Sequence, residues 1–265
     1  MEKTTPLSSE LVAGLEGLGG QGFENQTRED LTIPVIKLLQ GLNPEVKDGR
    51  GKIGQLFNSV TEEVCDSLLF VPAISAHEMV EFVPRSAGGG FVATHALNSD
   101  VVKWAKANCP FGAWRVPKGQ GAADNELVEF FSYFGVICDD LVPVGMAVFR
   151  FSGTKIKVYK QFNTRLQTFQ LEGAKGRRFT PPMFSHLVLV TTRDEKNNKG
   201  EYSNLVLRGA VDNDLGKGLM GADDPRLQMA VECRRLVMEG VVTAGYDEPS
   251  TREPGEDDVD DECRF

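Results

Sequence analysis

A run of basic residues in the middle of the chain is the segment best equipped for chemistry. Between residues 150 and 178 the sequence sets eight bases against one acid, Glu172, which gives a local charge of +7. A surface kept charged only for solubility normally mixes the two signs, so this basic segment predicts a surface that neutralises phosphates. Solvation of one helix face is the simpler alternative. The bases are Arg150, Lys155, Lys157, Lys160, Arg165, Lys175, Arg177 and Arg178.

Aromatic residues lie beside bases in and near this segment, which is the combination that a single-stranded nucleic acid needs. Bases stack on exposed rings, at about 1–3 kcal/mol per base, while cations hold the backbone. Tyr159 lies within the segment, and a glycine-rich loop at 173–179 ends in Phe179. Each tryptophan could instead be a core anchor, and residues 82–90 could be only a strand and its turn. The further expected DNA contacts are Phe82, Arg85, Trp104, Trp114, Arg115 and Lys118.

The acidic C-terminus carries most of the chain's negative charge. From residue 246 onward nine acids face two bases, a charge of −7, whereas the whole chain carries −9. Such a segment is predicted to be disordered and to compete with DNA for the basic segment. Because it ends in an aromatic residue, it also suits a small apolar pocket rimmed by Arg and Lys on a partner protein, although it could be a mere solubiliser. The expected partner-binding residues are Asp257, Asp258, Asp260, Asp261, Glu262 and Phe265.

Catalytic motifs are weak in this sequence. Residues 49–54 match G-x-G-x-x-G, but a turn precedes them and a strand pattern follows, where a dinucleotide site needs a strand and then a helix. Asp139–Asp140 and 212–214 could bind a metal for a nuclease, yet Asp and Asn are also the usual turn residues at strand ends. The histidines are scattered, and His95 and His186 fit structural roles in strands. We therefore expect no enzyme activity, no catalytic residue, no metal and no cofactor.

The cysteines and the N-terminus indicate the cellular compartment in which the protein acts. The five cysteines are scattered and never spaced as C-x-x-C, which argues against a disulfide framework or a zinc site and favours a reducing compartment. Met1–Thr5 leads into no apolar run of signal-peptide or membrane-span length. We expect a soluble protein of the cytoplasm with no membrane contact.

Hydrophobic periodicity predicts the elements that must position these residues. In 154–169 apolar residues recur at spacings of three and four, which predicts a helix with a basic face. A second helix is predicted at 225–239, where acids precede a proline and Gly240 follows. A short capped helix is expected from Thr27 to Leu39. The predicted strands are 53–61, 68–76, 79–84, 90–95, 127–138, 143–152, 185–193 and 202–210.

This pattern predicts a mainly β fold with added helices, an OB-fold-like antiparallel barrel. The expected organisation is a flexible arm over 1–27, a core over 28–240 that carries helical insertions, and the acidic partner-binding tail over 241–265.

Several short segments resemble single-stranded DNA-binding proteins of tailed bacteriophages. They are 22–25, 30–34, 38–40 with 43–44, 82–85 before 88–90, and 152–155. The resemblance covers roughly residues 22–210 and implies an OB-fold that coats single strands in phage replication, recombination and repair without reading sequence. The end of the tail is similar to those of bacterial and short-tailed-phage single-strand binders, but Arg264 next to Phe265 departs from them.

The function predicted from the sequence is therefore non-enzymatic, sequence-independent binding of single-stranded DNA in the cytoplasm of an infected bacterial host. A polymerase, helicase or primase is the expected partner of the tail, and the protein could form homo-oligomers. Two alternatives stay open: a phage transcription or recombination factor that acts mainly through protein contact, and a metal-dependent nuclease.

Overall fold

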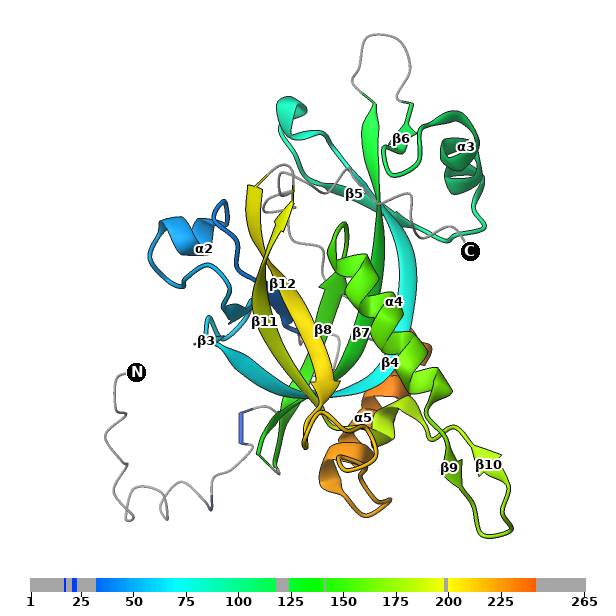
Figure 1. Cartoon of the computed structure of the whole chain (residues 1–265). Helices are drawn as coiled ribbons and strands as arrows, with labels where there is room; N and C mark the ends of the chain where they lie inside the picture. The colour runs from blue at the N-terminus through cyan, green and yellow to red at the C-terminus, as the bar shows by residue number, and fades with distance from the viewer. Residues whose placement is uncertain are drawn as a thin grey trace. The chain divides into compact units, whose positions relative to one another are not determined.

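The computed structural model describes residues 17, 21–22, 32–117, 124–140, 142–197 and 200–241 (Figure 1). The chain divides into two compact units, residues 1–32 and 33–265. All helices and strands named below belong to the second unit. The division falls after Thr32, whereas the sequence predicts an arm that ends at residue 27.

The second unit is mainly β, as predicted, and its main sheet is large and mixed. Its strands are β1 (Val35–Leu38), β2 (Leu56–Asn58), β3 (Val64–Cys65), β4 (Ser67–Phe82), β5 (Phe91–His95), β6 (Arg115–Val116), β7 (Asn125–Asp139), β8 (Val142–Phe151), β11 (Val188–Asn197) and β12 (Gly200–Gly209). Their order is β12-β11-β4-β7-β8-β1-β2-β3, with β5 paired to β4 and β6 to β7. A separate hairpin joins β9 (Leu171–Glu172) to β10 (Arg178–Phe179).

Helices flank this sheet. They are the α-helices α2 (Pro44–Lys47), α3 (Asp100–Asn108), α4 (Lys155–Thr168) and α5 (Pro225–Met238), and the 3-10 turns η2 (Arg85–Ala87) and η3 (Met183–Ser185). The predictions of α4 and α5 are confirmed. At the start of α5 the Asp224 side chain accepts a hydrogen bond from the Arg226 backbone N–H, and Gly240 adopts a positive φ after its end.

One helix expectation fails near the N-terminus, and one helix in the middle of the chain was not predicted. The helix predicted from Thr27 to Leu39 is wrong over its described part, because Val35–Leu38 is strand β1. Pro34 lacks a backbone N–H, its carbonyl accepts from Val148, and the β-branched residues that follow favour a strand. Helix α3 was not predicted; its first turn is capped by the Ser99 side chain.

The helices α4 and α5 pack on opposite faces of the sheet. Buried residues of α4, among them Tyr159 and Phe162, join one core cluster with Tyr133 of β7. Ala230 and Cys233 of α5 join another cluster on the other face. A third, smaller cluster lies where α3 packs on β4 and β7. Each face of the sheet therefore has its own apolar cover.

Strand β4 is one continuous strand of 16 residues, where the sequence predicts two. Strand β7 pairs with β4 from Leu69 to Phe82, with a bulge between Pro72 and Ile74. On its other side β4 pairs with β11 over residues 67–70 and with β5 over 79–82. No described strand pairs with that side between these two stretches, so the middle of β4 is an open edge.

The expected antiparallel barrel is corrected in two respects. Strands β1 and β8 run parallel, and the described strands do not close into a ring, because β12 and β3 end the path unpaired with each other. The side chain of Gln40, just after β1, bridges part of this opening. Its amide donates to the Ser203 carbonyl at 2.6 Å and accepts from the Ser203 N–H at 3.1 Å, so it occupies the edge of β12 as a neighbouring strand would.

Candidate nucleic-acid interface

Helix α4 presents a basic outer face because its apolar residues are held on the sheet. Ile156, Tyr159, Phe162 and Leu166 are buried, at spacings of three and four residues. This anchoring directs the side chains between them outward. Lys157, Lys160 and Arg165 are exposed as a result.

The loop predicted at 173–179 is an ordered hairpin at the end of α4 (Figure 1). Arg178 pairs with Glu172 and Phe179 with Leu171. Gly176 takes a φ of 71° at the tip, a conformation that glycine adopts without strain. Lys175, Arg177 and Arg178 are exposed, and 47% of Phe179 is accessible. The hairpin therefore places an exposed ring beside three cations.

Six cations on α4 and on this hairpin form what is called here the basic surface: Lys157, Lys160, Arg165, Lys175, Arg177 and Arg178. None of the six makes an ion pair with another described residue. Some exposed cations elsewhere do: Arg193 bonds Glu195, Lys196 bonds Glu201 and Lys217 bonds Asp212. Cations without a protein counter-charge keep their full charge for an anionic ligand.

Two further bases of the segment lie apart from this surface. Arg150 lies opposite Ser132 in the β7–β8 ladder. It therefore points away from its neighbours Phe149 and Phe151, which pack on the α4 side. Lys155, at the start of α4, is half-buried. Six of the eight predicted bases are thus exposed on α4 and on the hairpin that follows it.

Three of the aromatic residues predicted to contact DNA are in the core. Tyr159 is buried and lies 4.7 Å from the Phe131 ring centroid. Burial raises the pKa of its hydroxyl, and a side-chain hydrogen bond with Ser75 opposes that rise. Trp114 is only 5% accessible, and Phe82 is buried between Phe91 and Phe130. A base cannot stack on these rings, because apolar residues already cover them.

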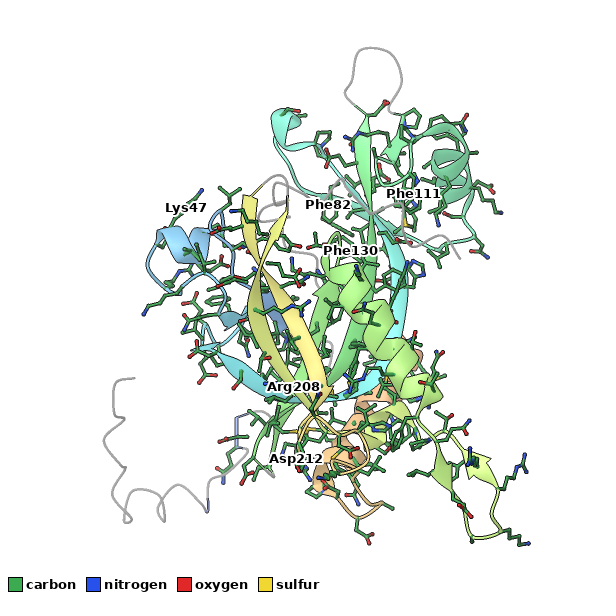
Figure 2. All side chains as sticks on the ribbon, in the orientation of Figure 1. Lys47, Phe82, Phe111, Phe130, Arg208 and Asp212 are labelled. Atoms are coloured by element: carbon green, nitrogen blue, oxygen red, sulfur yellow. The ribbon has the colours of Figure 1, made fainter. Side chains whose placement is uncertain are left out.

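Exposed aromatic rings also gather around α3. Trp104 is 45% accessible, and Phe111, which was not among the predicted DNA contacts, is 70% accessible. Figure 2 shows Phe111 at the end of the molecule that carries α3 and β6, with Phe82 and Phe130 nearby. Arg115 is paired with Glu126 at 3.4 Å. Lys118, the side chain of Arg85 and the tail residues from Asp257 to Phe265 lie outside the described residues.

The alternative sites show ordinary structural contacts. Asp212 bonds Lys217, and Asp214 accepts from the Gly216 backbone N–H at 2.8 Å, as turn residues do. Within the described part of the chain no group of three His, Cys, Asp or Glu side chains is placed to hold a metal ion. Residues 49–54 form a turn between α2 and β2. Among the described helices none is long and apolar enough to cross a membrane.

Comparison with known proteins gives one match. The sequence model of a family described as Pam3 phage gp34-like protein matches residues 2–240. No curated protein and no solved structure matches the chain.

Proposed function

The chain belongs to the family of Pam3 phage gp34-like proteins, and on that premise we propose that it binds single-stranded DNA without sequence preference during phage DNA replication, recombination and repair. One observation carries the proposal: the basic surface gathers six exposed cations that lack ion pairs within the described chain. When such cations bind phosphates, they displace the counterions condensed on the DNA. The release of these counterions drives binding.

Single strands suit this surface better than duplex DNA. Exposed rings accompany the cations at Phe179 and, around α3, at Trp104 and Phe111. Rings can stack only on bases that are free of a partner strand, and they accept every base. The proposal therefore includes coating of single strands without readout of sequence.

An OB-fold relationship belongs to the proposal as well. The bulged strand β4 pairs with different strands at its two ends, and Gln40 links β1 to β12 across the opening of the sheet. These features support a barrel-like sheet that is left open. Partner recruitment through the acidic tail, action in the cytoplasm of an infected bacterium and homo-oligomer formation also remain parts of the proposal.

Fluorescence anisotropy with labelled oligonucleotides tests the proposal. Single-stranded and duplex forms of two unrelated sequences should be titrated at two salt concentrations. We expect tighter binding to both single strands, with a log–log salt slope of about −0.7 for each phosphate neutralised. Equal affinity for the duplex, or a flat salt response, would contradict it.

Exposed apolar rings favour one second candidate, a phage transcription or recombination factor that acts mainly through protein contact. Phe111 and Trp104 are exposed, as are Phe91 and Val92 of β5, and protein interfaces are enriched in such aromatic residues. If tail deletion abolished function in infected cells while DNA affinity stayed unchanged, this candidate would be preferred.

A further inference from the structure

A half-exposed histidine, His77, lies on the open edge of β4 next to helix α4. Its side chain is 31% accessible. It sits opposite Phe131 in the β4–β7 ladder, and the two rings are stacked with centroids 3.9 Å apart and planes 20° apart. On the far side of this pair, Phe131 also stacks with the buried Tyr159. The imidazole is therefore the outermost ring of an aromatic stack rooted in the core.

The orientation of His77 is fixed by its neighbours. Glu129 bonds its Nε2 at 2.8 Å, and Phe131 covers one face. The 31% of the side chain that is accessible lies outside these two contacts. A ring held in this way loses little freedom when a flat partner settles on it, which favours binding.

A cation of the basic surface lies at the same stack. The Lys160 Nζ is 5.5 Å from the Phe131 centroid, and Lys157 lies one helical turn earlier on the exposed face of α4. Residues 71–78 of β4 have no described strand on that side. A chain can therefore approach His77 along this open edge with its phosphates beside α4.

We infer that His77 is a stacking platform for a nucleobase of single-stranded DNA whose backbone runs along α4. The inference rests on the proposed function and deepens it by assigning a base contact. The supporting juxtaposition is an oriented, accessible ring next to cations without ion pairs. Glu129 holds the edge of the ring, and Ser75, two residues earlier in β4, is engaged by the Tyr159 side chain.

Substitutions separate this role from a structural one. His77→Ala should weaken binding of oligo(dT) roughly 5- to 100-fold, the range found for loss of one stacked base, while His77→Phe, which keeps an aromatic face, should bind within about threefold of the parent. The matched control is His95→Ala, because His95 is also held by a carboxylate, Glu81, at 2.7 Å on the same face.

Proton NMR of the full-length protein gives a second readout that does not depend on stability. The chain has three histidines, so three Hε1 resonances can be assigned with single substitutions. On addition of oligo(dT), the Hε1 signal of His77 should move upfield through the ring current of the base. The buried His186 should not respond, and an abasic oligonucleotide of the same length should produce no such shift at His77.

The outcomes separate a failure of the stacking role from a failure of DNA binding. If Lys157→Glu with Lys160→Glu loses DNA while His77→Ala binds as the parent does and its signal does not move, the platform is refuted and the binding function stands. If the parent protein binds neither oligonucleotide, both fail. A loss of affinity shared equally by His77→Phe and His77→Ala would also overturn the stacking role.

Discussion

At the scale of single residues, the exposed cations of the protein differ in what surrounds them. Those on the β11–β12 hairpin have carboxylate partners, whereas those of the basic surface have none among the described residues. A paired surface cation contributes little to stability and its charge is already balanced. Charge reversal should therefore have different consequences at the two places.

Reversal of the hairpin cations is the most direct residue-level prediction. Changing Lys175, Arg177 and Arg178 to Glu should weaken single-strand binding about tenfold or more and reduce the magnitude of the salt slope by about 2, from three lost phosphate contacts. The melting temperature should stay close to that of the parent, since the side chains are exposed. The matched control reverses Arg193, Lys196 and Lys217. If the two triple variants bind alike, the basic surface is assigned wrongly.

A second residue-level prediction concerns His186, which is fully buried. Its Nδ1 donates to the Leu215 carbonyl at 3.2 Å, and its Nε2 has no hydrogen-bond partner in the described structure. Burial lowers the pKa of this imidazole, and the Leu215 hydrogen bond opposes the shift. The unfolded chain therefore takes up a proton more readily than the folded one, so the free energy of unfolding should fall as pH drops below about 6.5.

Urea unfolding at pH 7.5 and pH 5.5 checks this dependence. His186→Gln should be less stable than the parent at pH 7.5. The difference between its free energies of unfolding at the two pH values should be smaller than in the parent. His95→Gln serves as the comparison, since His95 is bonded to a carboxylate instead. An undiminished pH difference in His186→Gln would refute the assignment.

At the scale of elements, Gln40 is the side chain that completes the sheet. Gln40→Ala removes both of its hydrogen bonds to Ser203 and leaves a buried N–H and C=O without partners. We expect a loss of about 2–4 kcal/mol in the free energy of unfolding. The uncovered edge of β12 should also promote self-association.

Denaturant titration and analytical ultracentrifugation measure these two effects. Gln228→Ala is a suitable control, because Gln228 is exposed on α5 and makes one long hydrogen bond, 3.4 Å, to Ala222. If the two variants were equally stable and monomeric, Gln40 would have no role in closing the sheet.

The helices and strands show which signals in the sequence are sufficient to predict an element. Helix α4 follows from apolar spacing and α5 from its caps, because both signals are local. Strand β1 was missed although its β-branched residues favour a strand, because one of its two partners is distant: Val35 pairs with Val148. A break was expected at His77, although Ser75, His77 and Met79 continue the alternation of β4. The base platform was missed for that reason.

The same distinction holds for the candidate site. Charge and its local density identified the six cations of the basic surface, because charged side chains rarely become buried. The rings could not be sorted from sequence, since Trp104 and Trp114 both stand beside lysine or arginine. Only packing decides that Trp104 is exposed and Trp114 is covered.

At the scale of the whole molecule, two opposite charges share one chain. The C-terminal residues from 246 to 265 carry −7, and the basic segment carries +7. Intramolecular attraction between them should lower the apparent affinity for DNA at low salt. Screening should weaken this competition, since the Debye length is about 8 Å at physiological ionic strength.

Truncation after Gly245 is the corresponding experiment. We expect tighter binding of single strands at low salt, a gain that shrinks as salt is raised, and loss of binding to a replication or recombination partner. Removal of Phe265 alone should impair the partner contact and leave the DNA affinity nearly unchanged. A truncated protein with parental DNA affinity at low salt and intact partner binding would identify the segment as a solubiliser.

The contact between Gln40 and Ser203 has a consequence for the order of events on the ribosome. The two residues are 163 positions apart, and a ribosome adds about 5–20 residues each second. Gln40 must therefore wait roughly 10–30 s after it is made before Ser203 exists. Strand β1 can pair with β2 and β8 within that interval, whereas its link to β12 has to wait, so this link is the last of the three to form.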